Sequence, residues 1–130
     1  MDKIKVIIAG SRGIDDYNYI KHHLDNLFYY NDLFKNKEVI IISGTAKGVD
    51  RLGEYYGDNN SLKIERYPAN WNKHGKMAGY FRNSEMAKIA DIAIVFWDGQ
   101  SRGSKHMIDT MKRIKKPVIT IINNKVENNY

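Results

Sequence analysis

Five short apolar runs, separated by polar or amphipathic stretches, organise the chain. They are KVIIAG (5–10), EVIIISG (38–44), LKIERYP (62–68), IAIVFW (92–97) and PVITII (117–122). All except LKIERYP are nearly continuous in apolar residues, which is typical of strands covered by helices on both faces. The pattern therefore predicts five strands in a mostly parallel sheet.

Helical spacing fills most of the intervals between these runs. From about residue 16 to residue 34, Ile20, Leu24, Leu27 and Phe28 recur at the spacing of one helix face. Helical patterns also cover residues 48–60, YFRNSEMAKIA near 80–90, and about 104–114. Strands that alternate with helices through short connections predict an α/β fold, a Rossmann-like doubly wound sandwich with helices on both faces of the sheet.

The chain length fits one domain, which we place at residues 1–122. The segment ANWNKHGKMAG (69–79) is expected to be a polar, aromatic loop. Residues 123–130, NNKVENNY, read as a polar C-terminal tail that frays.

Charge favours an anionic partner, because 21 basic residues against 15 acidic ones give a formal net charge of +6. The basic run KRIKK (112–116) is better explained as the solvated end of a helix. With no cysteine and only four histidines, the sequence predicts no disulfide, no metal site and a cytoplasmic protein. No apolar segment is long enough to span a bilayer, and nothing indicates a cofactor.

Candidate chemistry gathers where three strands end. In a doubly wound sheet the first and fourth strands should lie side by side, with the second next to the first, and ligands bind beyond their carboxyl ends. These ends read GSRG (10–13), SGTAKGVDR (43–51) and WDGQSRGSK (97–105). Each combines glycine, a hydroxyl and a basic side chain, which is the chemistry that binds phosphate at a helix N-terminus. Any one of them alone would be explained by turn geometry.

A fourth element, NWNKHGKMAGYFRNSEM (70–86), adds an aromatic ring and further cations. Here an arginine can clamp phosphate bidentately and a tryptophan can stack on a base. The ligand-binding residues that we predict are Gly10, Ser11, Arg12, Gly44, Thr45, Ala46, Lys47, Gly48, Asp50, Arg51, Trp71, Lys76, Arg82, Asn83, Asp98, Gly99, Gly103, Ser104 and Lys105.

Three stretches together resemble the SLOG superfamily, specifically its YspA-like branch related to YpsA. They are AGSRGIDDY, ISGTAKGVDRLGEYYG and PANWNKHGKMAGYFRNSEMAKIADIAIVFWDGQSRGS, and the similarity runs from about residue 4 to residue 122. The superfamily also includes the lonely-guy phosphoribohydrolases and the DNA-processing protein DprA. The resemblance implies a Rossmann-like domain that binds nucleotides or nucleotide-derived ligands, and a homodimer, since members often form dimers.

Lonely-guy enzymes cleave N-glycosidic bonds with a PGGxGTxxE loop and an upstream arginine. The corresponding loop here is WDGQSRGSKHM, in which the catalytic glutamate falls at Met107 and Arg82 matches the arginine in kind. Because methionine cannot act as an acid or base, a hydrolase would need Asp50 or Glu85 in that role.

Three functions remain open. The first is binding of a nucleotide or an ADP-ribose-like ligand, as a sensor or sequestering protein. The second is nucleotide hydrolysis, with Arg82, Glu85 and Asp50 as the catalytic candidates. The third is binding of single-stranded nucleic acid, because SGTAKGVDRLG also resembles the SGxARGID motif of DprA. Abundant Asn, Lys, Ile and Tyr further suggest an AT-rich genome, such as that of a low-GC bacterium or its phage.

Overall fold

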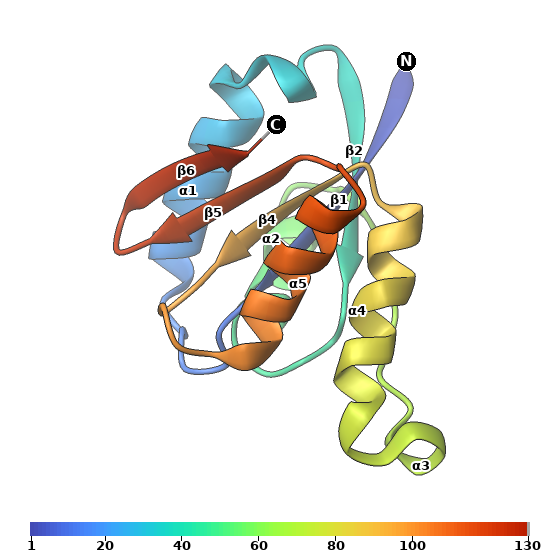
Figure 1. The fold of residues 1–130 in the computed structure, drawn as a ribbon. Helices are drawn as coiled ribbons and strands as arrows, with labels where there is room; N and C mark the ends of the chain where they lie inside the picture. The colour runs from blue at the N-terminus through green and yellow to red at the C-terminus, as the bar shows by residue number, and fades with distance from the viewer. Residues whose placement is uncertain (130) are drawn as a thin grey trace.

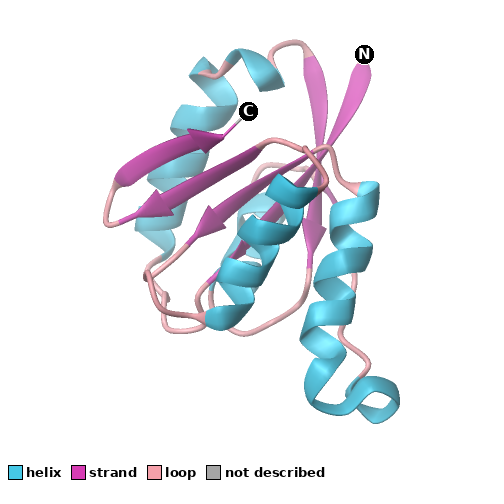
Figure 2. Ribbon diagram, in the orientation of Figure 1, coloured by secondary structure: helices cyan, strands magenta, loops and turns pink. Residues whose placement is uncertain are grey.

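A single twisted sheet forms the centre of the computed structural model, which describes residues 1–129. The sheet has six strands in the order β3-β2-β1-β4-β5-β6 and carries helices on both faces (Figures 1 and 2). The strands are β1 (Asp2–Gly10), β2 (Lys37–Ser43), β3 (Lys63–Arg66), β4 (Ile92–Phe96), β5 (Val118–Ile122) and β6 (Lys125–Asn129). The helices are α1 (Tyr17–Tyr30), η1 (Asp32–Phe34), α2 (Val49–Asn59), α3 (Trp71–His74), η2 (Gly75–Met77), α4 (Ala78–Ile89) and α5 (Arg102–Arg113).

The first five strands are parallel, as the continuous apolar runs predict, and β1 pairs with both β2 and β4. Strand β1 is buried on both faces because its side chains alternate between two cores. Val6 and Ile8 pack in the core that α1 and α2 cover. Ile7 packs in the opposite core with Met86 and Met107, under α4 and α5. The α/β Rossmann-like prediction is therefore confirmed.

The C-terminal segment differs from the prediction. Instead of fraying, residues 125–129 form β6, which pairs antiparallel with β5 and adds a sixth strand. The turn between these strands is Asn123-Asn124, and both residues have positive φ, 48° and 65°. Asparagine tolerates this conformation, which two-residue hairpins require. Asn124 Oδ1 also lies 2.9 Å from His23 Nε2, which ties the turn to α1.

Residues 69–79 are also more ordered than the predicted loop. They contain the single turn α3 and the short η2, which continue into α4. Asn70 caps α3, because its side-chain oxygen accepts a hydrogen bond from the Lys73 N–H at 3.0 Å. This helical arm extends beyond the sheet (Figure 1) and carries Trp71 at its start. None of the helices within residues 1–129 could cross a membrane.

Candidate functional site

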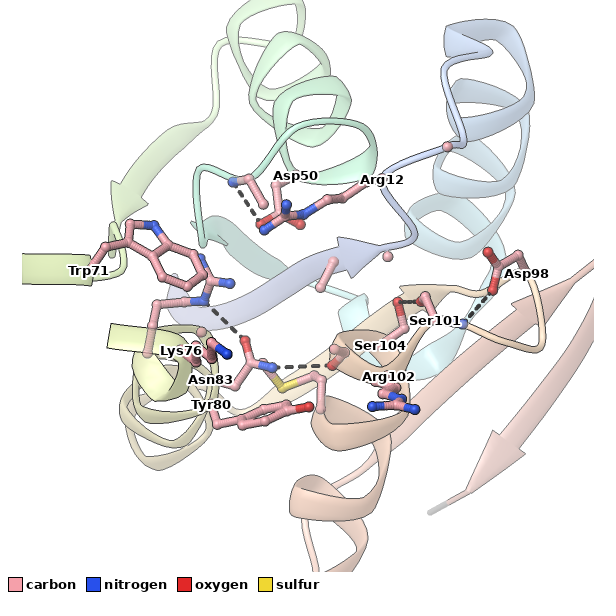
Figure 3. Close-up of a pocket in the computed structure, with 18 residues that line it drawn as sticks. Arg12, Asp50, Trp71, Lys76, Tyr80, Asn83, Asp98, Ser101, Arg102 and Ser104 are labelled. Carbon is pink, nitrogen blue, oxygen red and sulfur yellow. Dashed lines mark hydrogen bonds between the residues drawn. The ribbon is translucent and has the colours of Figure 1, made fainter. Parts of the chain in front are cut away.

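The carboxyl ends of β1, β2 and β4 and the helical arm surround one cavity of about 440 Å³ (Figure 3). Its walls are formed by Ala9, Gly10, Arg12, Gly13, Ala46, Asp50, Trp71, Lys76, Gly79, Tyr80, Arg82, Asn83, Asp98, Ser101, Arg102, Gly103, Ser104 and Met107. The cavity therefore lies at the topological switch point of the sheet, between β1 and β4.

The loops after β1 and β2 are in close contact through Gly48. This residue has a φ of 87°, and an added Cβ would lie 2.6 Å from the carbonyl oxygen of Arg12. Only glycine can adopt this conformation and approach without strain. Gly48 therefore brings the loop that leads into α2, which carries Asp50, against the loop that carries Arg12.

A chain of hydroxyl groups joins the loops after β1 and β4. The Ser11 hydroxyl accepts a hydrogen bond from the Asp98 N–H at 3.0 Å and lies 3.0 Å from the Ser101 hydroxyl. Ser101 in turn donates to the Ser104 hydroxyl at 2.8 Å. Asp98 Oδ1 accepts from the N–H groups of Gln100 and Ser101, both at 2.8 Å, and these bonds lower the pKa of Asp98. Ser11 is buried, and these contacts of its hydroxyl group hold the loops after β1 and β4 together.

Helix α4 supplies Arg82, which spans from the helical arm to the end of β2. Its Nη1 donates to the carbonyl of Gly44, and its Nε donates to Asn83 Oδ1 at 3.0 Å. Asn83 is buried and donates to the carbonyl of Gly103 at 3.2 Å and towards His106 Nδ1 at 3.3 Å. Burial lowers the pKa of His106, which favours the neutral ring that this contact needs. Asn83 thereby couples Arg82 to the N-terminus of α5.

Asp50 is the buried acid of the cavity, with only 4% of its surface exposed. It is the second residue of α2, and its Oδ2 accepts a hydrogen bond from the Ala46 N–H at 3.1 Å. Burial raises the pKa of Asp50 to about 6, although the Ala46 N–H and the charges of Arg82 and Arg12 act in the opposite direction. Desolvation therefore dominates over these favourable contacts.

Three cations border the cavity without internal partners. Arg12, Lys76 and Arg102 are exposed, and within residues 1–129 none of their charged groups makes a hydrogen bond or ion pair. Trp71, 52% exposed, and the half-buried Tyr80 add aromatic surface on the side of the helical arm. The cavity thus combines uncompensated positive charge, aromatic rings and a single deeply buried carboxyl group.

The structure places the predicted residues in two groups. The first group lines the cavity, and it consists of Gly10, Arg12, Ala46, Asp50, Trp71, Lys76, Arg82, Asn83, Asp98, Gly103 and Ser104. The second group is not part of the cavity walls, and it consists of Ser11, Gly44, Thr45, Lys47, Gly48, Arg51, Gly99, Lys105 and the catalytic candidate Glu85.

Several residues of the second group have other contacts. Lys105 pairs with Asp109 at 2.6 Å on the outer surface of α5, a pairing that the i, i+4 spacing could have revealed. Arg51 donates through Nε to the Thr45 carbonyl at 3.0 Å and holds its own loop. Glu85 is exposed on α4, and Met107, at which the resemblance places the lonely-guy glutamate, is buried and lines the cavity.

The cavity walls also include residues that were not predicted to bind ligand, among them Ser101, Arg102, Tyr80, Gly79, Gly13 and Ala9. Ser101 and Arg102 lie within the quoted loop WDGQSRGSK, where Arg102 begins α5. A cation at the first position of a helix that follows a phosphate-type loop was the signal that could have identified Arg102. No sequence pattern indicated Tyr80, because the way in which α4 packs decides which of its side chains face the cavity.

Comparison with known proteins supports the resemblance. The family model of the YspA, cpYpsA-related SLOG family matches residues 4–74, more than half of the chain. The Gene 61 protein of Mycobacterium phage D29 is 28% identical over 121 residues, which cover 88% of this chain and 94% of that protein. No solved structure matches the chain.

Proposed function

Since the chain belongs to the YspA, cpYpsA-related SLOG family, for which a nucleotide-related function is expected, we propose that its cavity binds a nucleotide or an ADP-ribose-like derivative. In this proposal the protein acts as a sensor or as a sequestering protein. The observation that carries it is the set of unpartnered cations, Arg12, Lys76 and Arg102, around one cavity at the switch point of the sheet.

The chemistry of the walls matches the parts of a nucleotide. The first turn of α5 offers N–H groups and the partial positive charge of a helix N-terminus, and Arg12 and Arg102 border the same space. This end is suited to a phosphate group. Trp71 offers an exposed ring on which a base can stack. A cavity of about 440 Å³ lies within the range of about 300–1,000 Å³ that is common for small-molecule sites.

Hydrolysis of a nucleotide is the second candidate, and the position of Asp50 favours it. Its pKa of about 6 lies close to neutrality, as is useful for a general acid or base, and its carboxyl group lines the cavity. In an N-glycosidic cleavage, water would add to the anomeric carbon while the bond to the base breaks. The base would leave with a proton. Of the two carboxylates considered for this role, Asp50 has a position suited to it, because Glu85 lies outside the cavity.

Mass spectrometry of small molecules tests both functions. The purified protein is incubated with nucleotides, NAD and ADP-ribose, then washed and denatured, and the wash and the released fraction are analysed. Intact ligand in the released fraction supports binding. A new base or ribose phosphate in the wash supports hydrolysis. If neither appears, the proposal is wrong.

Matched arginine variants connect the result to the cavity. The double variant Arg12→Ala/Arg102→Ala should retain at least about tenfold less ligand, because charged hydrogen bonds to phosphate contribute about 1.5–3 kcal/mol each. Lys112→Ala/Arg113→Ala removes the same charge, two positive groups, from the exposed C-terminal end of α5 and should retain as much ligand as the wild type. Equal losses in both variants would show non-specific attraction by net charge.

A further inference from the structure

We infer that the ligand of this cavity carries a ribose with both hydroxyl groups free, and that Asp50 is the residue that selects it. The inference rests on the proposed function and narrows it to ribonucleotides and their derivatives. It starts from the two acidic residues in the cavity wall, Asp50 and Asp98.

The two carboxyl groups differ in how far their acceptors are used. Asp98 is exposed, and its Oδ1 already accepts two backbone N–H groups. Asp50 accepts only the Ala46 N–H, through Oδ2, and within residues 1–129 no hydrogen bond reaches its Oδ1. Every fully buried side-chain oxygen in these residues has a hydrogen-bond partner. Because Oδ1 has none, it is not fully buried and retains contact with the cavity space. Asp50 therefore offers a ligand an unused acceptor.

The unused acceptor of Asp50 defines the kind of group that it can bind. An ionised carboxylate only accepts hydrogen bonds, and it repels phosphate. The positive charges of Arg82 and Arg12 favour the ionised form of Asp50, but neither arginine forms an ion pair with it. A ligand group that donates two hydrogen bonds, such as a vicinal diol, would satisfy a carboxylate that is 4% exposed.

The position of Asp50 favours a sugar over a base as its donor. A Cβ added to Gly79 would lie 3.7 Å from Arg82 Nη2 and 3.9 Å from the Trp71 ring. A Cβ added to Gly44 would lie 2.8 Å from both Arg82 Nη1 and Asp50 Oδ2. Arg82 thus stands between Trp71 and Asp50.

Figure 3 shows Asp50 between Trp71 on one side and Ser101 near the start of α5 on the other. In a nucleotide the ribose lies between base and phosphate. With the base on Trp71 and the phosphate at α5, the ribose falls beside Asp50. An acidic residue beyond the second strand has the same task in dinucleotide-binding sheets.

Paired probes test the inference directly. Each of the four ribonucleoside 5′-monophosphates and diphosphates, and ADP-ribose, is titrated calorimetrically against its 2′-deoxy counterpart at pH 7.5. We expect the ribo form of the preferred nucleotide to bind about tenfold tighter or more, because a buried acceptor left unpaired is penalised. In Asp50→Ala this ratio should fall to about one, with the affinity for the deoxy form retained.

Asp58→Ala is the matched control, because it removes an acid from the exposed end of the same helix and should leave the ratio unchanged. Should Asp50→Ala fail to fold, Asp50→Asn replaces it, since the amide oxygen can still accept from the Ala46 N–H while its NH₂ faces the cavity. That variant should also lose the preference for ribose.

Each remaining outcome overturns a defined statement. Equal binding of ribo and deoxy forms would overturn the inference and leave the proposed function standing. A ratio that survives in the folded Asp50 variant would show that another residue selects the sugar. Loss of preference between bases instead of sugars would assign Asp50 to the base. If no probe binds, the proposed function fails, and the inference fails with it.

Discussion

Arg82 and Gly44 are 38 residues apart in the sequence, yet the Arg82 guanidinium donates a hydrogen bond to the Gly44 carbonyl. The contact fixes α4 to the carboxyl end of β2. It also holds a positive charge beside Asp50, whose carboxyl oxygen approaches the same glycine. Burial lowers the pKa of Arg82, but an arginine remains charged near neutrality.

Gly44→Ala should disrupt this contact. The added methyl would lie 2.8 Å from both Arg82 Nη1 and Asp50 Oδ2, so at least one of these side chains must move. We expect a loss of about 1–3 kcal/mol in the free energy of unfolding, as is usual for overpacking, and a loss of nucleotide binding. Urea denaturation and calorimetric titration measure the two effects.

Gly13→Ala is the control for stability, because its added methyl meets no atom within 4 Å. It should denature at the same urea concentration as the wild type. If Gly44→Ala is as stable as Gly13→Ala and still binds, the close approach of Arg82 and Asp50 to Gly44 is not required.

Asp50→Asn should stabilise the protein at pH 8. Burial raises the pKa of Asp50 from 3.8 to about 6, so the folded state binds a proton more tightly than the unfolded state. Ionised Asp50 therefore lowers the stability above pH 6, by up to about 3 kcal/mol at 1.36 kcal/mol per unit. This penalty diminishes as the pH falls from 6 to below 4, where both states are protonated.

Thermal melting of wild type and Asp50→Asn across this pH range measures the effect. The variant should melt higher at pH 8, and the difference should shrink towards pH 4. Asp58→Asn, an exposed acid on the same helix, should show no such trend. If Asp50→Asn is more stable at pH 8, as expected, the wild-type protein retains a destabilising residue in its binding cavity, which fits a residue kept for its ligand. If the variant is instead less stable than the wild type at pH 8, the charge of Asp50 stabilises the folded protein.

Lys116→Met should destabilise the protein. Lys116 Nζ donates to the carbonyls of Ala87, Lys88 and Ala90, at 2.7–2.8 Å, and so caps the C-terminal end of α4. We expect a loss of about 1–2 kcal/mol, measured by urea denaturation. Lys112→Met removes an exposed lysine of α5 and should have little effect. Equal stability of the two variants would contradict the capping role.

The strands were predictable because burial on both faces leaves continuous apolar runs, and the adjacency of β1 to β2 and β4 followed from the usual arrangement of doubly wound sheets. β1, β2, β4 and β5 are rich in Val and Ile and largely buried, as is typical of parallel strands that helices cover on both faces. β6 was missed because all its side chains are exposed, so its pairing with β5 leaves no apolar pattern. Its signal was the Asn123-Asn124 turn.

The candidate site was predictable only at the level of loops. Composition identified the three strand ends, since glycine, hydroxyl and basic residues gather there. It could not show which side chains hold the loops together and which face the cavity. Ser11 and Lys105 have equally suitable chemistry, but Ser11 joins the loops and Lys105 pairs with Asp109. Side-chain direction depends on tertiary packing, which composition does not record.

Trp71 should report and strengthen ligand binding. Its ring is 52% exposed at the cavity wall, so stacking of a base would change its surroundings and its fluorescence. Trp71→Ala should weaken nucleotide binding by about five- to a hundredfold, as expected for one base stacked on an aromatic ring, whereas Trp71→Phe should retain part of the affinity.

Calorimetric titration with the nucleotide recovered by mass spectrometry measures the affinities of these variants, and the fluorescence change that Trp71 contributes in the wild type should disappear in Trp71→Phe. The control is Phe81→Ala, because Phe81 is an exposed aromatic residue of α4 that contacts His74 and does not line the cavity. This variant should bind like the wild type. If Phe81→Ala weakens binding as much as Trp71→Ala, the arm acts through its packing and the base does not stack on Trp71. The ribose would then lose its assigned place beside Asp50.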